Sequence, residues 1–314
     1  MATRKRSPKP KRVMRRTCGA MQVYHAQLES DPGFRQRQVA LEHATTMRMR
    51  SAHAARAKPY RLTVVVHVVY ANAAQNISTA QVKSQITALN KDYRAKNPDR
   101  SKTPTPWKGL VSDSFVEFAL ATKDPRGRPT TGITRTKTTR SAFVADDDGV
   151  KAAATGGVNA WPTDKYLNVW VCGALKDSRG HDLLGYAQFP GGPKATDGVV
   201  IWNGSFGTKG TAVKPFDLGR TATHEIGHYL NLHHIWGDAP NCHGDDLVAD
   251  TPPAEDANYN KPTFPLISCS NGPAGDMFVN YMDYVDDDTM FMFTAGQVAR
   301  MHAALDGPRK SLAT

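Results

Sequence analysis

The chain has 314 residues, of which 40% are hydrophobic, so it can bury one substantial core or two modest ones. No stretch approaches the roughly 18 uninterrupted apolar residues of a membrane-spanning helix, and no apolar segment follows the basic start as it does in a secretory signal. The net charge of +11 belongs to residues 1–58, which hold 14 Lys and Arg against three acids, while the rest of the chain holds 26 of each.

The first 20 residues predict a disordered basic tail, because they carry eight basic side chains, two prolines and no acid. Such a tail admits a second class of function, the binding of nucleic acid or an anionic surface. No aromatic residues interleave with the charges to stack on bases, and no amphipathic run follows them. We therefore expect no specific nucleic acid and no membrane as partner. The alternative predicts salt-sensitive DNA binding that disappears when residues 1–20 are removed.

The next predicted element is a helix over residues 32–56, since Asp31 resembles an N-cap and Pro32 a first helical residue. The β-branched run at residues 62–69 then predicts a strand. We expect the boundary between an N-terminal segment and the main body of the protein between residues 50 and 60.

Ser78 is predicted to cap a helix whose apolar residues, up to Tyr93, recur at helical spacing. A helix over about 218–231 and a last helix after Thr294, with Gln297 in the capping-box position, complete the helical elements. Further strands are expected near residues 114–121, 132–139, 166–173 and 197–202. The order predicts an α/β upper lobe with a mixed sheet, and a mostly irregular lower lobe that ends in a helix. The substrate cleft is expected between the lobes.

The segment HEIGHYLNLHH within the predicted helix and its end carries the most specific chemistry of the chain. His224 and His228 lie one turn apart on the same helix face and can bind one metal ion. Glu225, beside the first of them, can hold and deprotonate a metal-bound water. His234 supplies a third ligand if the chain turns back after the helix, and Asn231 tolerates the left-handed backbone of such a turn. This pattern predicts the open four-coordinate site of a catalytic zinc.

A second motif, Asn280-Tyr281-Met282-Asp283-Tyr284, follows downstream. A methionine in a tight turn beneath the ligands is the companion feature of metzincin metalloproteases. The segments TATHEIGHYLNLHHIWGD, VNYMDYVDDDTMFMFTAGQVARM and LLGYAQFPGGPKATDGVVIWN resemble the pappalysin family of metzincins, above all its ulilysin-like compact microbial members. The resemblance runs from about residue 15 to the C-terminus.

The resemblance implies a two-lobed zinc endopeptidase with a twisted mixed sheet, made with a helical N-terminal propeptide. It implies that Tyr284 hydrogen-bonds the oxyanion and that Met282 is structural. Asp287 matches the acidic residue at the base of the pocket for the side chain just after the scissile bond, which favours arginine and, less strongly, lysine. The expected parts are residues 1–58 as propeptide, 59–235 as upper catalytic subdomain and 236–314 as lower catalytic subdomain.

Cys18, in the segment RRTCG, is similar to the cysteine switch of the ulilysin-like propeptides. A thiolate is a strong zinc ligand and would displace the catalytic water, which leaves the zymogen idle. The propeptide would then be an intramolecular inhibitor of an enzyme that acts on peptides and proteins. Cleavage before arginine at Met49-Arg50 or Ala55-Arg56 would remove it.

The remaining expectations concern the lower lobe. The resemblance pairs Cys242 with Cys269 in a disulfide, which indicates an oxidising, extracellular location, while Cys172 is expected to be an inert buried thiol. Eleven Asp and Glu residues against one lysine between residues 238 and 288 favour a hard cation. The resemblance implies structural calcium at Asp246 and Thr251.

Overall fold

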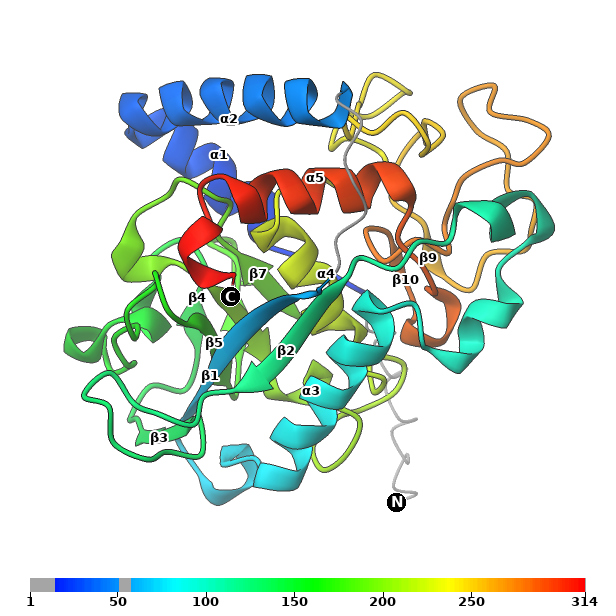
Figure 1. The fold of residues 1–314 in the computed structure, drawn as a ribbon. Helices are drawn as coiled ribbons and strands as arrows, with labels where there is room; N and C mark the ends of the chain where they lie inside the picture. The colour runs from blue at the N-terminus through cyan, green and yellow to red at the C-terminus, as the bar shows by residue number, and fades with distance from the viewer. Residues whose placement is uncertain (1–14, 51–57, 314) are drawn as a thin grey trace, which may run out of the picture.

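A six-stranded sheet forms the centre of the molecule in the computed structural model, which describes residues 15–50 and 58–313 (Figure 1). Its order is β2-β1-β5-β8-β7, and β3 pairs with the second half of β1. The 11-residue strand β1 accommodates β2 and β3 one after the other along a single edge, because each of these has only five residues. All pairs in this sheet are parallel except β7 with β8, so β7 is an antiparallel edge strand.

The helices are α1 (Ala20–Ser30), α2 (Pro32–Arg50), α3 (Thr79–Tyr93), α4 (Arg220–Tyr229) and α5 (Ala295–Asp306). The strands of the main sheet are β1 (Tyr60–Tyr70), β2 (Val116–Leu120), β3 (Ile133–Lys137), β5 (Leu167–Cys172), β7 (Gly185–Ala187) and β8 (Val199–Trp202). Two-residue strands are β4 (Phe143–Val144), β6 (Leu175–Lys176), β9 (Tyr259–Asn260) and β10 (Tyr284–Val285).

The central strands are buried on both faces, which explains their continuous apolar sequence. Helices α3 and α4 contact each other, and α3 packs on β2 while α4 packs on β7 and β8. Trp170 and Tyr186 belong to a second apolar cluster that includes loop residues between β4 and β5. The contacts with β7 and β8 thus fix the position of α4, the helix that carries the histidine motif.

The lower lobe consists mostly of loops between α4 and α5, as expected (Figure 1). A disulfide joins Cys242 to Cys269 with an S–S distance of 2.08 Å, and Cys172 is a buried free thiol. Helix α5 begins at a capping box formed by Thr294 and Gln297, as the sequence predicts. The α/β fold with an irregular lower lobe is therefore confirmed. In the described residues no helix is long and apolar enough to cross a membrane.

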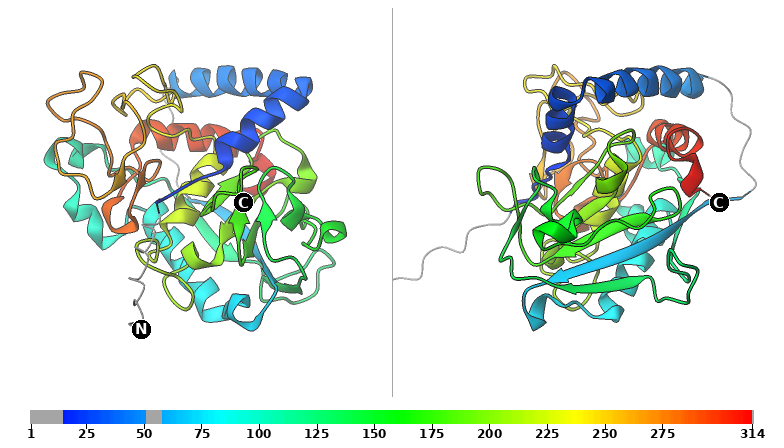
Figure 2. Two further views of the ribbon diagram at one scale, coloured as in Figure 1. Left: turned by 180° about the vertical axis from the view of Figure 1, so that it is seen from behind. Right: turned by 90° about the vertical axis from the view of Figure 1, so that its left-hand side faces the viewer.

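The N-terminal segment differs from its prediction. Residues 15–19 are not a tail: they lie against β7, and helix α1 follows them at once. Helix α1 was not expected from the sequence. Helix α2 starts where predicted but ends at Arg50 rather than at residue 56, and residues 51–57 and 1–14 lie outside the described residues. Figures 1 and 2 show α1 and α2 as a pair of helices, and α2 packs across α5.

The other elements agree with the predictions within a few residues. The side chain of Ser78 caps α3 by accepting a hydrogen bond from the backbone N–H of Gln81. The strands expected near residues 114–121, 132–139, 166–173 and 197–202 correspond to β2, β3, β5 and β8. The short edge strand β7 was not predicted.

Candidate active site

Helix α4 ends in the turn that the histidine spacing requires. Asn231 has a φ of 74°, so the chain reverses directly after the helix. The N–H of Leu232 donates to the carbonyl of Gly227 at 3.0 Å, which closes the turn. His234 is thereby carried back toward α4, as expected from an asparagine at this position.

The three histidines converge on one point. The Nε2 atom of His228 lies 3.1 Å from the Nε2 atoms of both His224 and His234. Each Nδ1 atom has another partner: the carbonyl of Tyr281 for His224, the carbonyl of Leu232 for His228, and Asp238 for His234. Because a Nδ1–H that donates outward leaves the Nε2 lone pair free, all three rings are oriented as metal ligands.

Cys18 completes this set. One donor atom from each of Cys18, His224, His228 and His234 lies within 4.8 Å of the others. A tetrahedral zinc site with Zn–N bonds of about 2.0–2.1 Å needs nitrogen atoms roughly 3.3 Å apart, which the histidines match. A thiolate with three imidazoles is also a donor set that suits zinc. The residues present therefore fit this metal.

Glu225 lies beside the fourth donor. Its Oε2 is 3.2 Å from the Sγ of Cys18, and burial raises the pKa of its carboxyl to about 8. Burial also raises the pKa of the Cys18 thiol well above its ordinary value, and the charge of Glu225 adds to this. A bound cation reverses both effects, since it stabilises the thiolate and the carboxylate. Gly185 of β7 permits this arrangement, because a Cβ there would lie 2.9 Å from the Cγ of Glu225.

Met282 packs against α4 at Gly227, which lies between His224 and His228 in the sequence. It is fully buried, and its Sδ would be 2.4 Å from a Cβ added at Gly227 of α4. The sulfur and the helix backbone can approach this closely only because residue 227 is glycine. Two residues on, the Tyr284 hydroxyl donates to the carbonyl oxygen of Cys18 at 3.5 Å. The tyrosine therefore reaches the cleft beside the fourth donor.

Asp287 forms the closed end of a pocket that holds Arg16. The guanidinium Nη2 of Arg16 is 2.5 Å from Oδ1 of Asp287, and both side chains are buried. The same guanidinium donates to the carbonyl of Val285 and the hydroxyl of Thr221, each at 3.1 Å. The backbone N–H of Leu218 donates to the second carboxylate oxygen at 2.8 Å. The pocket is thus complementary to a guanidinium in charge and in geometry.

The direction of the N-terminal segment in the cleft follows from its contacts with the edge strand. Cys18 pairs with Gly185 of β7 in a parallel bridge, with hydrogen bonds from the N–H of Gly19 to the Gly185 carbonyl at 2.9 Å and from Leu184 to Thr17 at 3.0 Å. The segment therefore runs parallel to β7. It pairs with backbone groups that an edge strand leaves free for an extended peptide.

Comparisons with known proteins agree with this geometry. Residues 154–306 match the peptidase family described as pregnancy-associated plasma protein-A. An extracellular metalloprotease of Arthroderma otae is 31% identical over 244 residues, which cover 76% of this chain and 75% of that protein. The chain belongs to the pappalysin family of metalloproteases. As a member of this family it is a metalloendopeptidase and holds a catalytic metal.

Two solved structures extend the likeness of this pappalysin to both forms of a relative. Mature mirolysin of Tannerella forsythia, in complex with a cleaved peptide, is 49% identical with a TM-score of 0.79, and the match covers 82% of this chain and 96% of that one. A mutant promirolysin of the same organism is 44% identical with a TM-score of 0.86, and the match covers 95% and 97%. The fold of the N-terminal segment therefore has a counterpart in a proenzyme.

The two residues expected to bind calcium, Asp246 and Thr251, lie together and hydrogen-bond to each other. The hydroxyl of Thr251 is 2.7 Å from one carboxylate oxygen of Asp246 and 2.9 Å from the other. Burial raises the pKa of Asp246 to about 7. In the described residues the only group of three or more possible ligands is the cluster of Cys18 and the histidines. Calcium stays a prediction.

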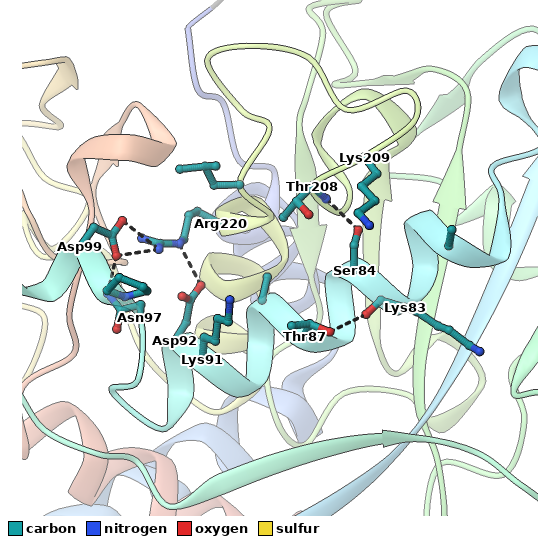
Figure 3. A pocket seen from close by; sticks show the side chains of 14 residues that line it. Lys83, Ser84, Thr87, Lys91, Asp92, Asn97, Asp99, Thr208, Lys209 and Arg220 are labelled. Carbon is teal, nitrogen blue, oxygen red and sulfur yellow. Dashed lines mark hydrogen bonds and ion pairs between the residues drawn. The ribbon is translucent and has the colours of Figure 1, made fainter.

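Behind α4, a buried ion-pair network fixes the start of the helix (Figure 3). Arg220 pairs with Asp92 of α3 at 3.0 Å and with Asp99 at 3.0 Å. These three side chains line one end of a cavity of about 640 Å³ that also contacts Leu218. None of the histidine ligands lines this cavity, so it lies outside the cleft. Leu218 and Arg220 link it to Asp287, because both line the cavity and both donate a backbone N–H to the Asp287 carboxylate.

Sequence reasoning missed three contributors to this site: Arg16, Asp238 and Gly185. Arg16 is one of eight basic residues in the first 20, and its partner Asp287 is 271 residues away. Asp238 lies four residues after His234, and this spacing brings the two side chains together only because of the turn that the chain makes there. Only the position of Arg16 two residues before Cys18 offered a signal.

Proposed function

We propose that this pappalysin is a latent zinc endopeptidase that cleaves peptide bonds before arginine and, less efficiently, before lysine. The observation that supports this most directly is the insertion of Arg16 between Asp287 and the wall of the cleft, next to a cysteine at the metal-ligand cluster. The N-terminal segment thus presents the side chain that the enzyme selects, together with a blocking thiol.

His224, His228 and His234 would hold the zinc, with Cys18 as fourth ligand in the zymogen. When bound, zinc lowers the pKa of water and polarises a carbonyl group. Glu225 is placed to take the proton of a water at the position of the Cys18 thiol and to return it to the leaving amine, because its carboxylate is 3.2 Å from that position.

Tyr284 would stabilise the oxyanion. Its hydroxyl already donates to a carbonyl oxygen, that of Cys18, which lies next to the fourth-ligand atom. A substrate carbonyl in the same place would receive this hydrogen bond more strongly as negative charge develops. Met282 supports the ligands from below and takes no part in the chemistry.

Asp287 would determine specificity through the pocket that Arg16 fills. The carboxylate is fully buried and receives two backbone N–H groups, from Leu218 and Arg220. A guanidinium offers several donors in a planar fork, whereas an ammonium offers a compact point charge. Arginine is therefore preferred over lysine.

We propose residues 1–58 as the propeptide, 59–235 as the upper subdomain and 236–314 as the lower one. The match to mature mirolysin covers 82% of the chain and that to promirolysin 95%, a difference close to the length of the described N-terminal segment, residues 15–50. The bond Met49-Arg50 lies in the last turn of α2, so cleavage there requires the turn to open. Ala55-Arg56 lies outside the described residues.

We also propose that the protein binds a structural Ca²⁺ and is secreted. Asp246, buried and raised in pKa, and Thr251 beside it would contribute oxygen ligands to a structural Ca²⁺. Secretion is supported by relatives named extracellular metalloproteases and by the disulfide between Cys242 and Cys269.

The test is incubation of the purified full chain with zinc and calcium, followed by mass spectrometry of its fragments. We expect trimming before Arg50 or Arg56 in the wild type and none in Glu225→Ala. Trace trypsin and casein in a parallel tube supply activation and substrate from outside. An intact chain that also fails to digest casein after trypsin treatment contradicts the proposal.

A further inference from the structure

We infer that release of the propeptide uncovers a carboxylate-binding subsite, built from Arg300 and Asn231, that takes an acidic side chain of the substrate on the side of the cleft before the scissile bond. The inference rests on the proposed function and adds a second determinant of specificity to it. In the zymogen this subsite holds Glu42 of helix α2.

The contacts of Glu42 show what the subsite binds. Both terminal nitrogens of Arg300 donate to its two carboxylate oxygens, each at 2.8 Å. The side-chain amide of Asn231 donates to Oε1 at 3.0 Å. Burial raises the pKa of Glu42, but the hydrogen bond and charge of Arg300 outweigh it, so the pKa lies below its ordinary value and the group is ionised. Three donors converging on one carboxylate make a built site.

All three donors belong to the catalytic unit, and only the acceptor belongs to the propeptide. The Nε of Arg300 donates to the backbone carbonyl of Asn231 at 3.1 Å, which fixes the plane of the guanidinium independently of Glu42. Arg300 is 1% exposed, and in the described part of the chain Glu42 is its only ion-pair partner. Removal of residues 1–58 therefore leaves an oriented guanidinium and an amide without their carboxylate.

The position of the subsite relative to the cleft follows from the direction of the propeptide. Arg16 fills the pocket proposed for the side chain after the scissile bond, and Cys18 lies at the metal cluster. Residues after Cys18 therefore cover the side of the cleft that a substrate occupies before its scissile bond. Helix α1 begins there and reaches Tyr24, whose ring lies 4.7 Å from Phe189 and 6.1 Å from His233.

The distance between the metal cluster and the subsite determines which residue of the substrate can reach Arg300 and Asn231. Tyr24 is six residues beyond Cys18: the four steps within α1 advance about 6 Å at a helical rise of about 1.5 Å each, and the two steps before the helix add at most about 7 Å at about 3.3 Å each. Its neighbour His233 belongs to the same turn as Asn231, whose side-chain amide donates to Glu42. An extended substrate advances about 3.3 Å per residue, so its third or fourth residue before the scissile bond reaches this turn. We expect Glu or Asp at that position to be favoured.

The experiment uses the full chain activated by limited proteolysis and a set of peptides with one arginine after the scissile bond. The peptides come in pairs that carry Glu or Gln at the second, third, fourth or fifth residue before that bond. We expect kcat/KM to be about tenfold higher for Glu at the third or fourth position and equal within each other pair. In Arg300→Gln the preference disappears, while Lys310→Gln, an exposed change beyond α5, leaves it unchanged.

Arg300 is buried in the zymogen, so two further variants keep the test decisive if Arg300→Gln does not fold. Arg300→Lys keeps the charge but loses the bidentate geometry, and we expect it to keep only part of the preference for Glu. Asn231→Gly preserves the positive φ and removes the amide donor, and we expect about a threefold loss of the preference.

Cleavage before arginine with equal kcat/KM for Glu and Gln at every position overturns the subsite and leaves the proposed function intact. Failure to cleave any peptide overturns the proposed function, and the subsite with it. A preference for Glu that persists in Arg300→Gln assigns the recognition to another group and also overturns the inference.

Discussion

The N-terminal segment, the proposed propeptide, contacts the rest of the protein in two regions that are built differently. In the first region, Cys18 forms a parallel bridge with the edge strand β7 and belongs to the metal-ligand cluster, and Arg16 pairs with Asp287, the residue proposed for specificity. Helix α2 lies on α5 and is fixed by the ion pair of Glu42 with Arg300. In the proposed zymogen the first region would block the reaction, and the second would hold the blocking segment in place.

The difference matters because cleavage between α2 and β1 breaks neither region. Under the proposed function, the wild-type propeptide would stay bound at both places after such a cleavage, and full activity would require its dissociation. Latency is then a question of affinity as well as of covalent connection.

The largest effect is expected from Cys18→Ser. A hydroxyl is a much weaker zinc ligand than a thiolate, so the uncleaved variant should be at least about 100-fold more active on a small peptide than the uncleaved wild type. Intact mass, measured before and after the assay, shows that no cleavage has occurred. Cys172→Ser, at a buried thiol in β5, is the matched control and should stay latent. Equal activity of Cys18→Ser and wild type contradicts the switch.

The second prediction concerns the specificity pocket. Asp287→Ala in the activated enzyme should lower kcat/KM for peptides with arginine after the scissile bond by about 100-fold, since a buried charge-assisted pair is lost. Peptides with leucine there should be affected much less. Asp288→Ala removes the neighbouring carboxylate, which pairs with Lys261 at the surface, and should change neither value. Retained arginine preference in Asp287→Ala would show that another group selects the side chain.

The third prediction tests Arg16 in the zymogen. Arg16→Ala leaves the buried Asp287 carboxylate without its cation, so the free energy of unfolding should fall by about 3 kcal/mol. Chemical denaturation of the zinc-loaded Glu225→Ala chain measures this without self-cleavage. Arg15→Ala is the matched control, because Arg15 is exposed and lies over the ring of Tyr259. Similar losses for both variants would contradict a specific role for Arg16.

The smallest effect belongs to the second region and depends on pH. The folded-state pKa of Glu42 is lowered, so the ion pair with Arg300 stabilises the complex above about pH 4.5, the ordinary value, and is lost as the pH falls below it. The nicked propeptide should dissociate a few-fold faster from Glu42→Gln than from wild type at pH 7, with the difference shrinking below pH 4.5. Fluorescence of a label on the propeptide follows this rate. A difference independent of pH would contradict the assignment.

The metal site could be predicted from the sequence because its geometry is local. His224 and His228 are related by helix periodicity alone, and the return of His234 requires only that residue 231 accept a positive φ. The Met-turn and the fold class followed from a resemblance spread over separate motifs. The central strands of the upper lobe could be predicted because burial on both faces of the sheet requires continuous apolar runs.

The contacts of the propeptide could not be predicted, because they join residues far apart in sequence. Glu42 and Arg300 are 258 residues apart, and each alone reads as an ordinary charged residue on a helix. The N-cap of helix α1 is Gly19, which has no side chain to cap the helix, and the first turn holds no acidic residue. The sequence therefore gives no signal for the start of this helix. Contacts with β7, α2 and Phe189 stabilise it instead.

The parallel bridge between Cys18 and Gly185 has a consequence for inhibitor design. Arg16 occupies the pocket proposed for the side chain after the scissile bond, and Cys18 follows it at the metal cluster. The segment therefore runs opposite to the direction proposed for a substrate, so its peptide bonds would not be oriented for hydrolysis. A short peptidomimetic based on Arg16-Thr17-Cys18 would combine an anchor in the acidic pocket with a metal-binding warhead. Its reversed polarity would also protect it from turnover by the enzyme that it blocks.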